Sequence, residues 1–331
     1  MNSFGRLFRI HIFGESHGEC VGLTIDGCPA GLPLAVEDFL EDIERRKGGM
    51  QKGTTPRKED DLPLFKTGMF NGRTTGAPLT ILFENKNTRS GDYEKQRAVP
   101  RPGHADFTAH AKYGGFEDFR GGGHFSGRLT VCLVAAGVIA KKLLKEISIR
   151  STILEIGGET DLDKGLEKAI AAKDSIGGIV ECRVNGLPVG LGEHFFDSAE
   201  SLLAHMAFSI PAVKGVEFGA GFAAARMFGS EHNDAIEDAT GKTRTNHAGG
   251  IVGGITNGNE LVYRVVIKPT SSTPKEQQTW NWETNEIDSF SVKGRHDLCI
   301  ALRVPVVLEA ATAIVLADLM LLAQNNKPVW S

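Results

Sequence analysis

The chain has 331 residues, of which 41% are hydrophobic, and this length and composition allow a large buried core and exclude a disordered chain. Its 37 basic residues are outnumbered by 41 acidic ones, so the formal net charge of −4 excludes the overall positive field that would attract nucleic acid or an anionic membrane. Any anion-binding site must therefore be built locally.

The N-terminus and the cysteines favour a protein that stays in the compartment where it is made. Two arginines and a histidine within the first eleven residues do not match a signal peptide. The apolar runs at 129–140 and 304–322 are too short or carry acidic residues, so we expect buried helices and not membrane spans. The five cysteines form no CxxC pair, which predicts free thiols in a reducing cytoplasm and no metal site.

Strands and helices are predicted in mixed order along the chain. Short apolar runs bounded by turn residues predict strands, and apolar residues at helical spacing predict helices. In chain order we expect a strand at 21–26, a helix at 36–46, a strand at 79–84, a helix at 130–147, a strand at 178–184, a helix at 199–206, strands at 215–222 and 261–267, and a final helix at 306–324. Since there is no repeat, linker or strict βαβ rhythm, we predict one α+β domain over residues 1–331.

A polar stretch at 271–292 separates the last predicted strand from the final helix. Loops of this length in compact proteins are usually functional or disordered. We therefore predict a mobile lid in this segment.

Four glycine-flanked polar clusters are the candidates for chemistry. They read GESHG at 14–18, RPGHAD at 101–106, RGGGHFSGR at 120–128 and GRHD at 294–297. The third cluster runs directly into the helix predicted at 130, and a glycine-rich turn before a helix suits phosphate because free N–H groups and the helix dipole face the anion. His17 and His104 are the natural proton donors, since histidine titrates near neutrality.

Basic residues gather close to these turns in the sequence. Arginine pairs with phosphate and carboxylate through two parallel hydrogen bonds, so such a set suits a substrate with several negative charges. The set comprises Arg45, Arg46, Lys47, Lys52, Arg101, Arg128 and Arg295.

Each motif alone has a structural explanation as well. A glycine-flanked histidine is more often a turn residue, charges at 45–47 can simply complement a helix dipole, and a triple glycine can be a bulge or hinge. Taken together, the residues support an anion-binding enzyme that uses histidine acid/base chemistry, and they support nothing narrower.

The clusters also resemble a known family. GESHG, RPGHAD, KYGGFEDFRGGG, VAAGVIAKK, TNHAGGIVGGITNG, KPTSS and GRHDLC occur in the order and approximate spacing found in chorismate synthases. The resemblance extends from Gly5 to about Asp318. It implies trans 1,4-elimination of phosphate from 5-enolpyruvylshikimate 3-phosphate to give chorismate, the last step of the shikimate pathway, with reduced FMN required and no net redox change.

The resemblance also assigns roles to individual residues. His17 resembles the acid that protonates the leaving phosphate, His104 the residue that keeps the flavin correctly protonated, and Asp297 the proton acceptor that works with flavin N5. The implied substrate-binding residues are Ser16, Arg46, Lys52, Arg101, Arg128 and Arg295. Lys52 stands where many members have arginine, which keeps the charge and loses the planar fork.

For reduced FMN, the resemblance implies contacts from His124, Phe125, Ser126, Glu231, His232, Gly253, Lys268, Pro269, Thr270, Ser271, Ser272 and Arg295. The common form of the third cluster reads GGGRSSARET, whereas this chain reads GGGHFSGRLT. Because Ser126, Arg128, both histidines and Asp297 remain, we expect an active variant. His124 can replace the arginine as a backbone-and-ring contact to the flavin, and Phe125 can stack or simply pack.

The family's architecture is an α+β sandwich of long central helices between antiparallel β-sheets. The resemblance further implies a cytoplasmic homotetramer with its active site near subunit contacts, an external source of reduced flavin, and an association with NADP. Two other interpretations stay open. A flavoprotein oxidoreductase would need a nicotinamide-binding fingerprint, and no GxGxxG motif follows a strand here; a non-catalytic anion-binding protein on the same scaffold is suggested by the altered third cluster.

Overall fold

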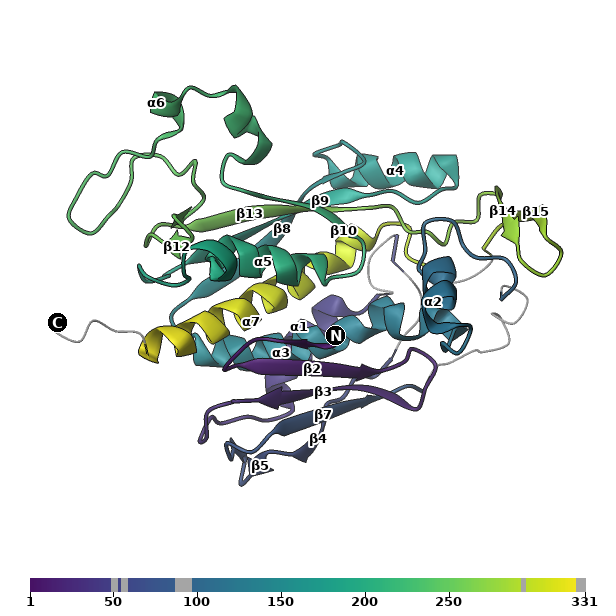
Figure 1. Ribbon diagram of the computed structural model, residues 1–331, viewed down its shortest axis with the longest axis horizontal. Coiled ribbons are helices and arrows are strands. Elements are labelled where there is room, and N and C mark those ends of the chain that lie inside the picture. Colours follow the sequence, from purple (N-terminus) through teal and green to yellow (C-terminus); the bar gives the residue numbers. More distant parts are fainter. Residues whose placement is uncertain (49–52, 55–58, 87–96, 293–295, 326–331) are drawn as a thin grey trace.

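Two antiparallel sheets enclose a layer of helices in the computed structural model, which describes residues 1–48, 53–54, 59–86, 97–292 and 296–325 (Figure 1). The first sheet has the order β1-β2-β3-β7-β4 and contains β1 (Ser3–Phe4), β2 (Arg9–Gly14), β3 (Cys20–Asp26), β4 (Leu64–Thr67) and β7 (Leu79–Glu84). The second has the order β10-β13-β9-β8 and contains β8 (Ser148–Ile156), β9 (Gly178–Asn185), β10 (Val213–Phe218) and β13 (Leu261–Ile267).

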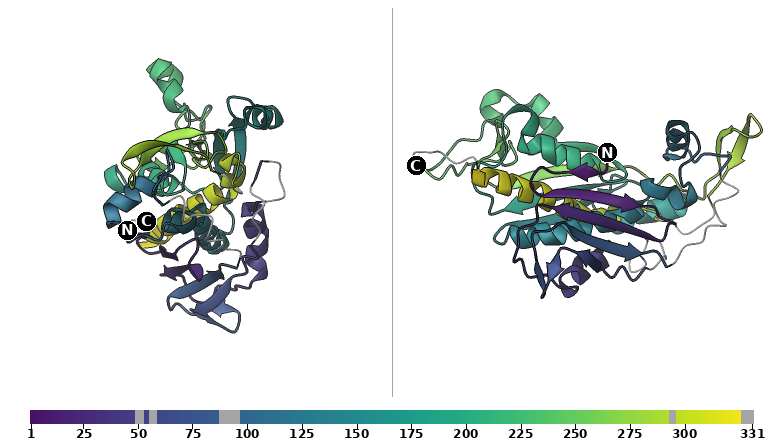
Figure 2. Two further views of the ribbon diagram at one scale, coloured as in Figure 1. Left: turned by 90° about the vertical axis from the view of Figure 1, so that its right-hand side faces the viewer. Right: turned by 60° about the horizontal axis from the view of Figure 1, so that its bottom comes forward.

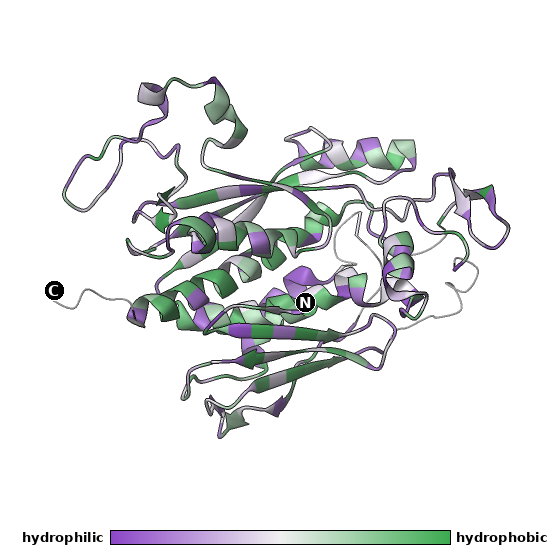
Figure 3. Ribbon diagram, viewed as in Figure 1, coloured by the Kyte–Doolittle hydropathy of each residue, from purple (hydrophilic) through white to green (hydrophobic). Residues whose placement is uncertain are grey.

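The helical layer is built around α3 (Thr130–Leu143) and α7 (Val304–Asn325), which pack against each other along their length. On the outer side α3 contacts β2 and β3, whereas α7 contacts β8 and β9, so each helix covers one sheet. The helices α1 (Glu37–Arg46) and α5 (Ala199–Phe208) flank this pair. Figure 3 shows that α3 and α7 are hydrophobic over most of their length, because nearly all faces of both are buried.

Small residues let α3 and α7 approach closely. A Cβ at Gly137 would lie 2.3 Å from the Cβ of Ala310, a distance that real side chains do not reach. Gly137 is therefore required by packing, since helix propensity alone disfavours glycine at this position.

Smaller elements project from the two ends of the layered body (Figure 2). At one end lie α2 (Asp106–Tyr113) and the hairpin of β14 (Gln277–Asn281) and β15 (Glu286–Phe290); at the other lies an arm that carries α6 (Gly229–His232). The remaining elements are α4 (Leu162–Ala172), β5 (Met69–Phe70), β6 (Arg73–Thr74), β11 (Ile251–Val252), β12 (Ile255–Thr256) and the 3₁₀ turns η3 (Arg120–Phe125), η4 (Gly127–Leu129), η5 (Phe195–Asp197), η6 (Gly221–Arg226) and η7 (Ile300–Arg303).

All nine of the predicted helices and strands are present; two of them end earlier than predicted, and the segment predicted as a loop contains a hairpin. The helix predicted at 130–147 ends at Leu143, because Lys145 adopts a left-handed conformation and the chain then enters β8. The strand predicted at 215–222 ends at Phe218, where the backbone turns at two glycines with positive φ. The segment at 271–292 contains the β14–β15 hairpin and is not a plain loop; its mobility stays a prediction.

Two stretches of the described chain, Arg120–Leu143 and Ile300–Gln324, are long and apolar enough to cross a bilayer by composition. Most of each is buried in this fold, as expected for core helices. The five cysteines are free thiols, as predicted.

Candidate active site

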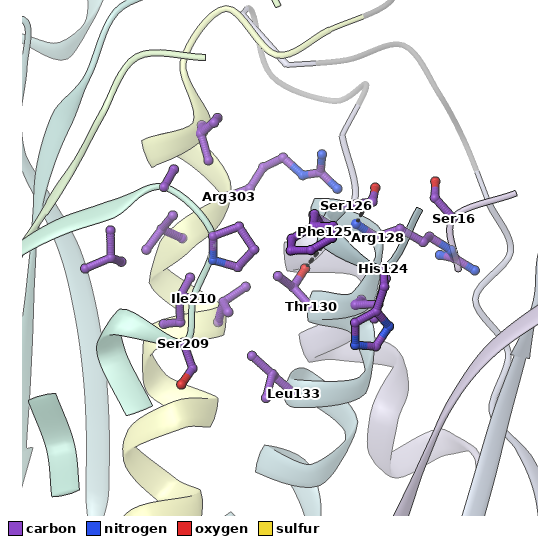
Figure 4. Close-up of a pocket in the computed structure, with 18 of the residues that line it drawn as sticks. Ser16, His124, Phe125, Ser126, Arg128, Thr130, Leu133, Ser209, Ile210 and Arg303 are labelled. Carbon is purple, nitrogen blue, oxygen red and sulfur yellow. Dashed lines mark hydrogen bonds between the residues drawn. The ribbon is translucent and has the colours of Figure 1, made fainter. Parts of the chain in front are cut away.

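A cavity of about 860 Å³ opens at the end of the layered body where α3 and α7 begin (Figure 4). Its walls come from the N-terminal segment and β2, the 14–18 loop, the 120–128 turn, the first turns of α3 and α7, and the segments at 101–105, 209–214 and 268–272. Three of the four predicted clusters therefore meet at one place, and the described part of the fourth, His296 and Asp297, joins them.

His17 is held against the glycine turn. Its side chain is buried, and its ring lies so close to Gly121 that a Cβ there would come within 2.2 Å of His17 Cε1. Gly121 also has φ of +59°, which glycine adopts without steric cost. Ser16 N donates to Gly123 O at 3.1 Å, so the backbones of the two loops are joined next to His17. Close approach to the His17 ring thus explains the glycine at 121, whereas a Cβ at Gly123 would come within 2.0 Å of the carbonyl oxygen of Asp118.

His104 is oriented by Asp106. His104 Nδ1 lies 2.6 Å from Asp106 Oδ1, and Arg101 donates to both carboxylate oxygens of Asp106, through Nε at 2.7 Å and Nη2 at 2.8 Å. Burial opposes the charged carboxylate, but the hydrogen bonds from Arg101 and His104 hold the pKa of Asp106 well below its usual value. The ionised Asp106 accepts the Nδ1 hydrogen of His104 and leaves Nε2 available on the other side of the ring.

Asp61 joins the two arginines that bracket the start of α3. The side chain of Asp61 is 0% exposed; its Oδ2 accepts from Arg46 Nη2 at 2.7 Å and its Oδ1 accepts from Arg128 Nη1. Burial opposes ionisation of Asp61, yet the charges of the two guanidinium groups lower its pKa. Burial lowers the pKa of Arg46 to about 10. This value is still well above neutral pH, so the arginine remains a cation. Two cations and one anion leave a net positive charge on the cavity wall.

Asp297 is paired with an arginine that the sequence did not single out. Arg303 Nη1 donates to Asp297 Oδ2 at 2.9 Å, and Arg303 Nε donates to Arg46 O at 2.8 Å. Figure 4 shows Arg303 extending from the α7 side toward Ser126. A continuous chain of contacts therefore joins Asp297 to the arginine pair around Asp61.

The 268–272 segment lies on the same wall, and Lys268, Thr270, Ser271 and Ser272 line the cavity. Ser272 Oγ accepts from Arg101 Nη1 at 3.1 Å, and Ser271 Oγ donates to Gly103 O at 2.7 Å. Burial, followed by the charge of Lys214, lowers the pKa of Lys268. Hydroxyl groups and an ammonium group are thus collected beside the His104 loop.

Some predicted site residues are not brought to this cavity. His124, Phe125 and Ser126 line it, but Glu231, His232 and Gly253 lie on the arm and the β11–β12 turn at the far end of the molecule. Pro269 adjoins the wall without lining it. Lys52 and Arg295 lie outside the described residues. Glu231, His232 and Gly253 therefore meet a flavin in this cavity only if a second copy of the chain supplies them.

Sequence analysis missed Asp61, His296 and Arg303, which line the cavity, and Asp106, which holds His104 from outside the cavity lining. Asp106 had a signal, because a carboxylate two residues after His104 can accept from its ring. Burial and the charge of Arg101 lower the pKa of His296, so this imidazole is neutral at pH 7. Asp61 had no local signal, since Arg128 is 67 positions away. Arg303 lies six positions after Asp297, but its bond to the backbone of Arg46 spans 257 positions and had no local signal.

The wall fits an anionic substrate and a phosphorylated cofactor. Within the described residues, Ser16 Oγ and Arg46 Nε are buried and have no hydrogen-bond partner, so each can bond to a ligand in the cavity. Arginine, lysine and hydroxyl groups supply the donors that phosphate and carboxylate require.

Comparisons with known proteins agree with this chemistry. Residues 8–321 match the family model described as chorismate synthase. The chain is 72% identical to the chorismate synthase of Chitinophaga pinensis, covering 100% of this chain and 99% of that protein, and 47% identical to that of Dehalococcoides mccartyi, covering 97% of each. A crystal structure of chorismate synthase matches with a TM-score of 0.74 at 27% identity, covering 97% of this chain and 93% of the solved one. The solved structure confirms the α+β class.

Proposed function

Because the chain belongs to the chorismate synthase family, we propose that its 860 Å³ cavity binds 5-enolpyruvylshikimate 3-phosphate beside reduced FMN. The activity is that of the family, a carbon–oxygen lyase reaction that removes phosphate and gives chorismate at the last step of the shikimate pathway. One observation supports the location best: two histidines and three buried arginines, distant in sequence, line a single cavity.

Substrate charge accounts for the arginines. The substrate carries a phosphate and two carboxylates, and Arg46, Arg101 and Arg128 are buried cations on the wall. Since two of them share Asp61 and the third is paired with Asp106, their guanidinium planes are fixed before the substrate arrives. Ser16 Oγ adds a hydroxyl donor. Lys52 and Arg295 complete the proposed substrate-binding set.

The histidines and Asp297 handle protons in this proposal. His17, buried against Gly121, gives its proton to the departing phosphate, which would otherwise leave with a full extra charge. His104, oriented by Asp106, maintains the protonation of the flavin near N1. Asp297 accepts the proton of the substrate ring, working with flavin N5, and Arg303 holds its carboxylate in place. Reduced FMN, when bound, lends electron density transiently and recovers it, so that no net redox change occurs.

The 268–272 segment supplies the cofactor-binding groups of this cavity. Lys268, Thr270, Ser271 and Ser272, with Pro269 among them, offer one cation and three hydroxyl groups for the phosphate and ribityl chain of the flavin. Phe125 and Ser126, which also line the cavity, would add contacts to the flavin, and Arg295 belongs to the same proposed set. These assignments follow the family motif residue by residue, and the lining of the cavity supports them.

A homotetramer completes the proposal, within the family's sandwich of central helices between antiparallel sheets. Glu231, His232 and Gly253 lie far from their own cavity, so a neighbouring copy is the route by which they reach a flavin. Phe222 and Phe228 on the same arm are 80% and 78% exposed, as expected for residues that a partner covers. We further propose a cytoplasmic enzyme that receives its reduced flavin from an external, NADP-linked reductant, without nucleic-acid or membrane partners.

The test is anaerobic conversion of 5-enolpyruvylshikimate 3-phosphate with FMN reduced by dithionite. Chorismate and phosphate should form in equal amounts, and the flavin should be recovered reduced; omission of flavin should abolish both products. Folded protein that binds flavin and substrate but forms neither product would favour the non-catalytic interpretation. Net oxidation of the flavin in step with product would favour an oxidoreductase.

A further inference from the structure

His124 is engaged by protein groups on both sides of its ring. Its Nδ1 lies 2.8 Å from the carbonyl oxygen of Gly14, 110 positions away in the sequence, and its Nε2 lies 3.2 Å from Asn2 Oδ1. A carbonyl oxygen can only accept, so Nδ1 carries a hydrogen and donates it. With Nδ1 so fixed, Nε2 bonds either to the NH₂ of a flipped Asn2 amide, if the ring is neutral, or to Oδ1, if it is protonated.

Through its bond to Gly14 O, His124 holds the start of the 14–18 loop, which carries Ser16 and His17. Gly14 ends β2 with φ of +95°, a conformation that belongs to glycine, and the chain turns there into the loop. The far side of the loop is held by Asn85, whose Nδ2 donates to Glu15 O at 3.0 Å and to Gly18 O at 2.9 Å. The loop is therefore fastened at its start by His124 and further along by Asn85.

A polar contact between the ring of His124 and the flavin would compete with these bonds. Both ring nitrogens already have partners within hydrogen-bond distance, so a ligand bonded to either one must displace Gly14 O or Asn2. Displacing the Gly14 bond would leave a carbonyl oxygen without its side-chain donor and release the start of the loop. The hydrogen-bond geometry therefore favours a role in which the ring of His124 acts on the protein and not on the ligand.

We propose that His124 is a positioning residue for the general acid: its Nδ1–H bond to Gly14 O fixes the 14–18 loop, and with it the ring of His17, against the glycine turn. The proposal rests on the proposed function, because His17 acts as an acid only if the chain eliminates phosphate. It replaces the ring part of the backbone-and-ring contact to the flavin that the family resemblance implies for His124. This role needs a hydrogen-bond donor at the position of Nδ1, and it does not need a charged side chain at residue 124.

Two amide substitutions separate the two bonds of His124. In His124→Asn the side-chain NH₂ occupies the place of Nδ1 and can still donate to Gly14 O, whereas in His124→Gln it reaches the place of Nε2 and can bond only to Asn2. Each variant loses one hydrogen bond, so their melting temperatures should be similar. A difference in turnover between them then reports on the Gly14 bond and not on stability.

We expect His124→Gln to lower kcat roughly tenfold, since a misplaced catalytic group costs about that much or more, and His124→Asn to stay within about twofold of the parent. The KM for 5-enolpyruvylshikimate 3-phosphate and the Kd for FMN should change by less than about threefold in both, because the arginines and the 268–272 segment are untouched. Equal losses of kcat in both variants, or a matching loss of FMN affinity that excess flavin rescues, would overturn the proposal.

If the parent protein forms no chorismate, the proposed function fails, but the positioning of His17 by His124 can still be tested by spectroscopy. In spectra of protein labelled with ¹⁵N-histidine, the His17 ring signals should shift or broaden in His124→Gln and stay unchanged in His124→Asn. Unchanged His17 signals in both variants would contradict the positioning role directly.

Discussion

The two neighbouring arginines at the end of α1, Arg45 and Arg46, pair with two buried carboxylates that have different functions. Arg45 donates to both oxygens of Glu309 at 2.7 Å, and Lys141 joins them at 3.2 Å in the helical layer, away from the cavity. Arg46, the next residue, points into the cavity wall and pairs with Asp61. Both carboxylates are at most 3% exposed on their side chains, and each binds two cations.

The difference lies in what surrounds each group. Glu309 has a further partner in the backbone of Ser151, whose N donates at 3.0 Å, so its oxygens are satisfied within the protein. In the Asp61 group, the buried Nε of Arg46 has no hydrogen-bond partner among the described residues, and Arg46 is one of the residues that line the cavity. A satisfied ion network stabilises the fold, whereas one with a spare donor facing a cavity is ready to bind an anion.

The largest effect expected is on stability and belongs to the Glu309 network. Glu309→Gln removes the more deeply buried of the two carboxylates that pair with Arg45 and Lys141 and leaves them only Asp42, so the free energy of unfolding should fall by about 3 kcal/mol. Urea denaturation measures it. The kcat and KM of the folded protein should stay within about twofold, and a specific rise in KM would show that this network also serves the cavity.

His17→Ala should have the next largest effect, on turnover alone. Loss of a general acid typically costs roughly 10²-fold in rate, which corresponds to about 2.7 kcal/mol. Because the flavin-binding segment proposed at 268–272 is untouched, the affinity for FMN should be nearly unchanged. Anaerobic steady-state kinetics and FMN titration measure the two quantities, and full activity in His17→Ala would exclude its role as the acid.

The two arginines also show how far the sequence alone could lead. Hydrophobic periodicity located the helix that carries Arg45 and Arg46 and most of the core, because the apolar residues of a buried face recur at regular spacing in the sequence. Periodicity did not indicate which arginine faces the cavity. That depends on Asp61 and Glu309, which are 15 and 264 positions away from Arg46 and Arg45, respectively, and are brought close only by tertiary packing.

The same limit applies to the glycine cluster. The motif predicted a phosphate-binding turn before a helix, and the turn does run into α3. Its contact with His17 at Gly121, and the bond from His124 to Gly14, depend on strand β2 lying beside the turn. Resemblance to a family supplied residue roles, including a flavin contact for His124, but it could not supply the bond from the His124 ring to Gly14 O.

Acid should lower the stability of the folded protein by protonating the two carboxylates that pair with the arginines of the cavity. Asp61 and Asp106 have lowered pKa values in the folded chain because of their arginine partners, although burial opposes the charge. A carboxyl group with a lower pKa in the folded state contributes stability above its unfolded pKa of about 4 and loses it as pH falls through the folded value. The unfolding free energy should therefore decrease below about pH 4, and Asp61→Asn should make that decrease shallower in urea titrations at pH 3 to 7.

The most direct test of the difference between the Asp61 and Glu309 networks compares two variants, Asp61→Asn and Glu309→Gln. The KM for 5-enolpyruvylshikimate 3-phosphate is measured on the folded fraction of each. Removing the charge of Asp61 frees Arg46 and Arg128 from their shared orientation, and a charge-assisted hydrogen bond is worth about 1.5–3 kcal/mol, so we expect KM to rise roughly tenfold. Glu309→Gln should leave KM within about twofold. An unchanged KM in Asp61→Asn, or an equal rise in both variants, would contradict the account.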